Sequence, residues 1–450
     1  MKCIEDEIPF DLPEGWSWCR VHTVASVKGG KRIPKGYSVI DMPTNHAYIR
    51  VTDMKNQTVL VDDLKYITDD VFSQISAYTI SKDDLYVTIA GTIGSVGEIP
   101  DILDGMNLTE NAVKISNISI NKKYLCYVLS SEFVQKQFRY QTHQVTMAKL
   151  ALERILDTLI PVSPLKEQKQ ITERIQEANE QIEHLNESTI QIGRLINKAK
   201  SKILDLAIRG QLVPQSPTDE PASVLLDRIR AEKEELIKQG KIKRDKKESV
   251  IFKGEDNSYY LSTGGQVESI EEWNLDMIPK SWTLCCLGEV CDYGNCINVE
   301  TGAINDTDWI LDLEDIEKDS GRVLKKVMKK DRNANSTKHR FHKGQVLYSK
   351  LRPYLNKVVL ADDDGYCTSE ILPLEFHKII VPEYARYYMM SPTFLAYADR
   401  CSYGVKMPRL GTPDGKKAVF VVPPVDEQKR IAEAIESAFE QLNSIGATLE

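Results

Sequence analysis

A heptad pattern of apolar residues runs through positions 166–208. Apolar or small residues recur there at alternating steps of four and three, and the seam they form is Ile171, Ile175, Ala178, Ile182, Leu185, Thr189, Ile192, Ile196, Ala199, Ile203 and Leu206. This period predicts one long helix that pairs as a coiled coil. Residues 171–206 would span roughly 54 Å at about 1.5 Å per residue. The alternative is a core helix of one globular domain, but such helices usually end within about 20 residues.

A second seam with the same alternation lies at positions 426–449. Its principal apolar residues are Ile431, Ile435, Leu442 and Ile445. The two helices also begin alike, since Pro164-Leu165-Lys166-Glu167-Gln168 matches Pro424-Val425-Asp426-Glu427-Gln428. The second helix is therefore the expected partner of the first.

The match at the helix starts belongs to a longer internal repeat with a shift of 260 positions. Further pairs at this shift are Gly105 with Gly365, Met147 with Met407, and Leu150 with Leu410. With small insertions, Trp16 aligns with Trp282. The repeat predicts the order globule, helix, globule, helix. Because most residues between these anchors differ, we interpret the globules as two modules that do the same job on different targets.

Each globule is predicted to mix strands and helices. In the first, residues 85–89 and 112–115 favour strands, residues 124–140 favour a helix, and residues 147–159 favour a strand or short helix leading into the long helix. Between the globules, residues 222–238 favour a second amphipathic helix. A charged linker is expected at residues 239–248, followed by a polar, Gly- and Ser-rich stretch at 253–266.

Composition is typical of a globular protein. The chain has 450 residues, of which 42% are apolar and 28% charged, enough for two to three domains. No apolar run approaches 18 residues and the acidic start lacks a secretory signal, so we expect a cytoplasmic protein without a membrane span. The nine cysteines are odd in number, which argues against a disulfide framework. Cys285, Cys286, Cys291 and Cys296 lack the paired spacing of a thiolate metal site, so no metal is expected.

Basic residues concentrate in two stretches, although the net charge is −8. Residues 322–357 hold twelve Lys and Arg against one acid, Asp331. Such side chains neutralise phosphates, and Arg can read base edges. The candidate DNA-binding residues are Lys325, Lys326, Lys329, Lys330, Lys338, Arg340, Lys350 and Arg352 in this stretch, and Lys28, Lys31, Arg32 and Lys35 in a Gly-rich loop of the first globule. The alternative is a solvated charged face without a ligand.

In these features the chain resembles the specificity subunits of type I restriction-modification systems. The resemblance rests on the repeated helix starts and on three further segments, which are residues 13–16 (PEGW), 207–213 (AIRGQLV) and 346–358 (VLYSKLRPYLNKV). It implies an α+β fold with two tandem target recognition domains separated by long helices, which pair as an antiparallel coiled coil. The implied segments are 1–164 and 276–424 for the recognition domains, 165–212 and 425–450 for the spacer helices, and 213–275 for a short helix and linker.

The resemblance also implies the partners. Each recognition domain would read half of a split double-stranded DNA site, and the helices would fix the distance between the halves and dock two methyltransferase subunits, with restriction-translocase subunits bound through them. The sequence has no N-P-P-[YF] or D-P-P-[YF] methyltransferase motif and no G-x4-G-K-[ST] phosphate loop, so no catalysis and no catalytic residue is expected. S-adenosylmethionine, ATP and Mg would then belong to the partner subunits. The alternative function is a coiled-coil adaptor between proteins that does not bind DNA.

The two predicted helices differ in length. The second ends about 24 residues after its start, whereas the first runs past 40. The exposed remainder of the first helix needs cover from residues 222–238, from a methyltransferase subunit or from another copy of the chain. The sequence leaves this choice open, together with the target sequence and the spacer length.

Overall fold

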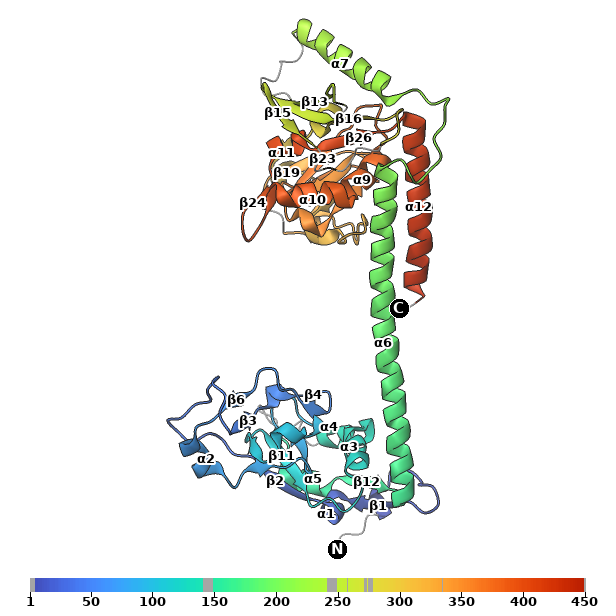
Figure 1. Ribbon diagram of the computed structural model, residues 1–450. Coiled ribbons are helices and arrows are strands. Elements are labelled where there is room, and N and C mark those ends of the chain that lie inside the picture. Colours follow the sequence, from blue (N-terminus) through green and yellow to red (C-terminus); the bar gives the residue numbers. More distant parts are fainter. Residues whose placement is uncertain are drawn as a thin grey trace. The chain divides into compact units, whose positions relative to one another are not determined.

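The computed structural model describes residues 5–140, 149–240, 249–256, 258–270, 273, 278–333 and 335–448. Met147 and most of the predicted charged linker therefore lie outside the described residues. The chain divides into two compact units, residues 1–186 and 187–450, with α6 (Leu165–Ile208) starting in the first and ending in the second (Figure 1).

Two four-stranded sheets form the framework of the first unit. In order across the sheet, the first has β6 (Lys65–Tyr66), β3 (Ala47–Ile49), β10 (Met106–Leu108) and β7 (Thr79–Ile80). The second has β2 (Ser26–Gly29), β11 (Ala112–Ser116), β8 (Leu85–Thr88) and β9 (Val96–Glu98). The strands predicted at 85–89 and 112–115 are thus confirmed as β8 and β11, which pair antiparallel with Val87 opposite Val113.

Three helices pack their apolar residues against the second sheet. They are α3 (Lys122–Ser130), α4 (Glu132–Tyr140) and α5 (Leu152–Asp157). The prediction of a single helix over 124–140 is wrong, because the helix is interrupted at Ser131, whose backbone is extended. The Ser131 hydroxyl donates to Val128 O at 2.6 Å and accepts from Val134 N at 3.4 Å, so it ends one helix and caps the next.

Shorter elements complete the first unit. Strand β1 (Ser17–Arg20) pairs antiparallel with β12 (Leu159–Val162), which leads directly into α6. The others are α1 (Val21–Val24), the hairpin strands β4 (Met54–Lys55) and β5 (Thr58–Val59), and α2 (Asp69–Ile75). α2 packs with Tyr48 and Ile67 in a small core of its own.

The second unit repeats this frame. The elements α9 (Pro382–Met390), α10 (Pro392–Arg400), α11 (Thr412–Lys417), β26 (Val419–Val422) and α12 (Val425–Ala447) follow α3, α4, α5, β12 and α6 at a shift of 260 positions. Strand β16 (Thr283–Cys286) pairs antiparallel with β26 as β1 does with β12 and leads into α8 (Leu287–Val290), as β1 leads into α1. The predicted internal repeat is therefore structural.

The sheets of the second unit follow the same plan. One has the order β17 (Ile297–Val299), β19 (Lys338–Phe341), β22 (Gly365–Thr368) and β18 (Ile310–Leu311). The other has β21 (Val358–Leu360), β20 (Val346–Ser349) and β23 (Ile371–Leu374). β18 pairs in parallel with β22, as β3 does with β10.

The end of α6 pairs antiparallel with α12, as predicted (Figure 1). Lys200 Nζ donates to Asn443 Oδ1 at 2.6 Å, and Gln215, beyond the end of α6, donates to Glu427 at the start of α12. The later residue of the first segment, Gln215, thus contacts the earlier residue of the second, Glu427, so the two helices run in opposite directions. α6 stops at Gly210, whose φ of +68° favours glycine and where a Cβ would lie 2.3 Å from Pro279 Cγ.

The segment between the globules contains more structure than predicted. The amphipathic helix at 222–238 is confirmed as α7 (Ala222–Lys238). The stretch assigned to a polar linker instead forms a three-stranded antiparallel sheet of β13 (Ser249–Lys253), β14 (Tyr259–Thr263) and β15 (Gln266–Ser269). Ile251 and Leu261 anchor this sheet in the core of the second unit.

Candidate nucleic-acid interface

The basic residues predicted in the first unit lie in β2 and in the segment that follows it. Lys28, Lys31, Arg32 and Lys35 are all exposed. The backbone that carries them is fixed, because Lys31 N donates to Leu108 O at 2.9 Å and Lys31 O accepts from Tyr48 Oη at 2.8 Å. The Lys31 ammonium also lies 5.3 Å from the centroid of the Tyr78 ring, within cation–π range.

Arg32 is tied to an acid. Its Nε donates to Glu110 Oε1 at 2.6 Å, although 80% of the Arg32 side chain is exposed. This bond raises the pKa of Arg32, and for Glu110 the bonds from Arg32 and its neighbours outweigh burial and lower the carboxyl pKa. Tyr48 Oη shares its single proton between Lys31 O at 2.8 Å and the other Glu110 carboxylate oxygen at 3.2 Å, so Glu110 is held in place beside the basic loop.

Five of the twelve basic residues in the run of the second unit form ion pairs, which the count of one acid did not predict. Acids from the segments on either side fold against it. The ion pairs are Arg322–Glu317 at 3.0 Å, Lys325–Asp315 at 3.8 Å, Lys326–Asp362 at 2.9 Å, Lys329–Asp306 at 3.4 Å, and Arg332 with Asp312 and Asp315. The first part of the run, residues 322–332, is thus a folded segment held by ion pairs.

Lys326 and Lys329 make contacts that fix these loops. The Lys326 ammonium lies 4.6 Å from the centroid of the Trp309 ring, in addition to its ion pair. Lys329 Nζ donates to the backbone oxygen of Ile304 at 2.5 Å. Both side chains therefore serve the local fold, which weakens the case that they exist to contact phosphates.

Lys338 lies in the interior. Only 4% of the residue is exposed, and its Nζ donates to Ser336 Oγ at 3.2 Å. Its strand neighbour His339 is also buried, and burial lowers the pKa of that imidazole. A buried ammonium does not reach a phosphate, so we remove Lys338 from the candidate surface.

The structure places Lys330 and Arg340 on the surface and Lys350 and Arg352 in one half-buried loop. Arg352 takes a left-handed backbone conformation, with φ of +50°, and its N donates to Pro408 O at 2.7 Å. The same loop approaches Arg409, whose guanidinium holds Glu370 through a pair of hydrogen bonds of 3.0 and 2.9 Å. Sequence reasoning missed Arg409 and Glu370, although Glu370 is the repeat counterpart of Glu110.

The predicted seam residues fall into two groups. On α12, Ile431 and Ile435 are fully buried, whereas Leu442 is half-buried and Ile445 is 50% exposed. Sequence reasoning missed Phe439, which is buried between them and packs against Tyr387 of α9. On α6, the half-buried residues are Ile171, Ile175, Ile192, Ile196 and Ile203.

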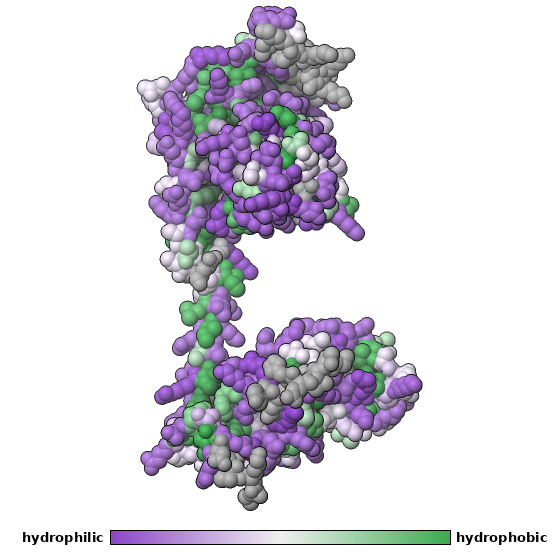
Figure 2. Space-filling view, turned by 180° about the vertical axis from the view of Figure 1, so that it is seen from behind, coloured by the Kyte–Doolittle hydropathy of each residue, from purple (hydrophilic) through white to green (hydrophobic). Residues whose placement is uncertain are grey.

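The middle of α6 keeps an apolar surface. Ile182 and Leu185, both predicted to be buried in the seam, are 55% and 65% exposed within the described chain. Figure 2 shows apolar side chains, in green, at the surface along this helix. α7 does not provide the cover considered above, because its buried residues Leu225 and Leu226 face the second unit, where Leu226 joins the core.

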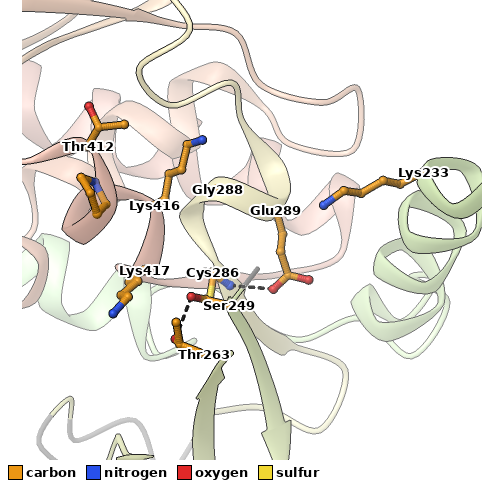
Figure 3. A pocket seen from close by; sticks show the side chains of 10 residues that line it. Lys233, Ser249, Thr263, Cys286, Gly288, Glu289, Thr412, Lys416 and Lys417 are labelled. Atoms are coloured by element: carbon orange, nitrogen blue, oxygen red, sulfur yellow. Dashed lines mark hydrogen bonds between the residues drawn. The ribbon is translucent and has the colours of Figure 1, made fainter. Parts of the chain in front are cut away.

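A pocket of about 470 Å³ lies within the second unit (Figure 3). Its lining residues come from α7, the three-stranded sheet, α8 and α11, and include Lys233, Glu289, Lys416 and Lys417. Glu289 accepts from Cys286 N at 2.9 Å and pairs with Arg230 at 2.9 Å, so its charge is balanced locally. The pocket contains none of the predicted DNA-binding residues.

The described residues show neither a metal site nor a membrane-spanning helix. No group of three or more His, Cys, Asp and Glu side chains there is arranged to hold a metal ion. Cys285 and Cys291 are fully buried, and burial raises the pKa of both thiols, which keeps them protonated. None of the described helices combines the length and the hydropathy needed to cross a bilayer.

Comparison with known proteins points to one family. Residues 13–194 match the family model of the type I restriction modification DNA specificity domain. The specificity subunit of the type I restriction enzyme EcoDI from Escherichia coli is 23% identical over 375 residues, which cover 83% of this chain and 74% of the relative. The specificity subunit of EcoAI from the same species is 67% identical over 51 residues, or 11% of this chain and 9% of the relative.

Solved structures agree on the fold. A chain from a structure described as the structural basis underlying complex assembly and conformational transition of the type I R-M system has a TM-score of 0.56 at 16% identity, over 98% of this chain and 94% of that chain. The HsdS subunit from Thermoanaerobacter tengcongensis has a TM-score of 0.51 at 15% identity, over 99% and 94%.

Proposed function

We propose that the chain is a specificity subunit of a type I restriction-modification system and that it selects the DNA sequence on which a multisubunit methyltransferase and restriction enzyme acts. The observation that carries this proposal is the duplicated module. Both units share the paired strands β1–β12 and β16–β26, the helices α3 to α5 and α9 to α11, and a following spacer helix, whereas the segments between these shared elements differ. A shared frame with different loops suits two readers of two different half-sites.

Each unit is proposed to bind one half of a split double-stranded DNA site. The proposed segments are residues 1–164 and 276–424 for the two recognition domains, 165–212 and 425–450 for the spacer helices, and 213–275 for the connection. In the first unit, the exposed cations Lys28, Lys31, Arg32 and Lys35 support phosphate contact. In the second, Lys330, Arg340, Lys350 and Arg352 do so, and Lys325, Lys326 and Lys329 form a loop scaffold beside them.

The chemistry is proposed to reside in other subunits. Specificity subunits carry no catalytic activity of their own, and this chain selects rather than modifies. Two methyltransferase subunits would supply S-adenosylmethionine, and the restriction-translocase subunits would supply ATP hydrolysis with Mg. The exposed apolar residues Ile182 and Leu185 support docking of a methyltransferase subunit along α6. Such a complex would act on DNA in the cytoplasm.

The experiment that tests the proposal exchanges one module. Residues 9–160 are replaced by the matching module of a relative, and the chain is expressed with its methyltransferase partner. Sequencing of the methylated bases should show that one half-site changes and the other stays the same, because each unit reads its own half. Changes in both halves would contradict independent reading, and methylation without any sequence dependence would refute the function itself. A protein adaptor would direct no methylation.

A further inference from the structure

An exposed hairpin stands out in the second unit. Strands β24 (Ser402–Tyr403) and β25 (Arg409–Leu410) pair antiparallel, with Tyr403 opposite Arg409, and Figure 1 shows β24 projecting from the body of the unit. Five consecutive residues at its end, 403–407, are exposed. Among them Val405 is completely exposed, Tyr403 is 63% exposed and Met407 is 49% exposed. Much of this apolar tip is left uncovered by the chain, which points to a partner.

The stem of the hairpin is fixed to the basic loop. Leu410 N donates to Lys350 O at 3.0 Å, and Arg352 N donates to Pro408 O at 2.7 Å. Arg409 forms an isolated β-bridge with Leu351 and holds Glu370 through its guanidinium. The tip is therefore fixed by hydrogen bonds to the same backbone that presents Lys350 and Arg352.

The first unit joins the corresponding two residues through a backbone oxygen instead of a carboxylate. Lys149, the repeat counterpart of Arg409, donates from Nζ to Glu110 O at 3.3 Å, and Glu110 is the counterpart of Glu370. The residues before Lys149 lie outside the described part, but in the sequence repeat Val145 and Met147 align with Val405 and Met407. At the intervening position Thr146 replaces Lys406. The repeat thus preserves an apolar pair and varies its neighbours.

We propose that the hairpin tip, through Tyr403 and Val405, contacts base edges of the half-site read by the second unit and helps to choose that sequence. This inference rests on the proposed function. Apolar side chains recognise the thymine methyl group in the major groove, and apolar wedges also open base steps in the minor groove. Lys350, Arg352 and Lys406 would neutralise the phosphates beside the contacted bases.

The positive charges around the hairpin tip favour DNA over a protein subunit as its binding partner. The hairpin and the adjoining basic loop contribute Lys350, Arg352, Lys406 and Arg409, and the carboxylate of Glu370 beside them is held by Arg409. The Arg409 guanidinium keeps the pKa of Glu370 below its usual value, so the acid stays ionised and paired. An apolar tip framed by cations complements a groove between phosphates.

The test uses the full chain with its methyltransferase partner. The variants are Tyr403→Ser and Val405→Ser, and the matched control is Val267→Ser on β15 of the same unit, where the side chain is also exposed. Loss of a base contact should reduce discrimination at one or two positions of one half-site by roughly 5- to 150-fold. The other half-site and the control variant should keep the wild-type sequence.

Two readouts separate the possible failures. Sequencing of methylated bases with wild-type chain tests the proposed function, which fails if no defined site appears. If wild type yields a defined site and both tip variants keep that site and its affinity for DNA, only the hairpin inference is overturned. It is equally overturned if the variants lose binding to the methyltransferase subunit while the site stays unchanged, since the tip would then dock protein. Because the mutated side chains are exposed, all variants should retain the wild-type thermal unfolding midpoint.

Discussion

The indole Nε1 of Trp16 donates a hydrogen bond of 2.8 Å to Glu167 Oε2 and so ties the start of the first unit to the start of α6. The same bond joins Trp282 to Glu427 at 2.9 Å at the start of α12. The duplicated Glu of the two helix starts therefore has a defined task, which is to lock each spacer helix to the β-strand pair of its own unit.

The residue after each Glu completes the joint. Gln168 Oε1 accepts from Asn121 N at 2.9 Å, and Gln428 Oε1 accepts from Val381 N at 2.7 Å. Both amides also donate to a backbone carbonyl five residues before them, at 2.6 and 2.9 Å. Each Gln thus connects its spacer helix to the start of α3 or α9, and the helix cannot rotate without breaking these bonds.

The two joints should differ in strength. Trp282 and Glu427 are buried, whereas Trp16 and Glu167 are half-buried. Glu427→Ala should lower the free energy of unfolding of the second unit by about 1–3 kcal/mol, because it leaves a buried indole N–H without an acceptor. Glu167→Ala should cost about 1 kcal/mol or less. Denaturant unfolding with hydrogen exchange of peptides from each unit measures both, and Glu433→Ala, exposed on α12, is the control. Equal losses in the two units would contradict the argument.

Salt dependence should separate exposed from buried cations. Lys330 is exposed, whereas Lys338 is buried. Lys330→Ala should weaken binding to all DNA sequences about equally and lower the slope of log K against log salt by about one. Lys338→Met should leave that slope unchanged. Binding titrations of the complex at several salt concentrations provide the measurement, and an unchanged slope for Lys330→Ala would show that this side chain faces solvent in the complex.

The Glu370–Arg409 pair should make stability depend on pH. The hydrogen bonds from Arg409 lower the pKa of Glu370 below its ordinary value of 4.5, against an opposing contribution from burial. The stabilisation is therefore fully present above that ordinary value and is lost as the pH falls through the lower pKa of the folded state. Thermal unfolding of wild type and Glu370→Gln between pH 3 and 7 should show a gap that closes on the acid side. Glu383→Gln, at an exposed position of α9, should show no such trend.

Sequence periodicity predicted the long elements well, and local composition predicted the charged surface poorly. The α6 seam and the repeat at 260 positions rest on many residues that share one constraint, so single exceptions do not hide them. The ion pairs within the basic run were not predicted because their acids, such as Asp306, Asp315 and Asp362, lie outside the run in the sequence and meet it only through the fold.

The sheet of β13, β14 and β15 and the buried position of Phe439 were also not predicted from the sequence. The sheet of β13, β14 and β15 escaped prediction because all four residues of β15 are exposed and polar neighbours surround the few buried ones. Phe439 was missed because a strict heptad places Ala438 in the seam, whereas α12 buries residues four apart, Ile431, Ile435 and Phe439, against α9 as well as α6.

The length of α6 should set the distance between the two half-sites. α6 is one helix of 44 residues, and its middle, which includes Ile182 and Leu185, is exposed within the described chain. Deleting residues 178–184 removes one heptad, which shortens the helix by roughly 10.5 Å and turns its ends by only about 20° relative to each other. Since duplex DNA rises about 3.4 Å per base pair, the spacer between the half-sites should shrink by about three base pairs while the recognised bases stay the same.

Deleting residues 178–181 is the matched control. Four residues turn the helix by about 40° in the opposite sense, at 3.6 residues per turn, so the seam changes phase and assembly with the methyltransferase subunits should weaken. The spacer length of the methylated site in the seven-residue deletion is the decisive observable. If that variant stays active and its spacer is unchanged, the helices do not set the distance between the half-sites, and the spacing must come from the bound subunits or from bending of the DNA.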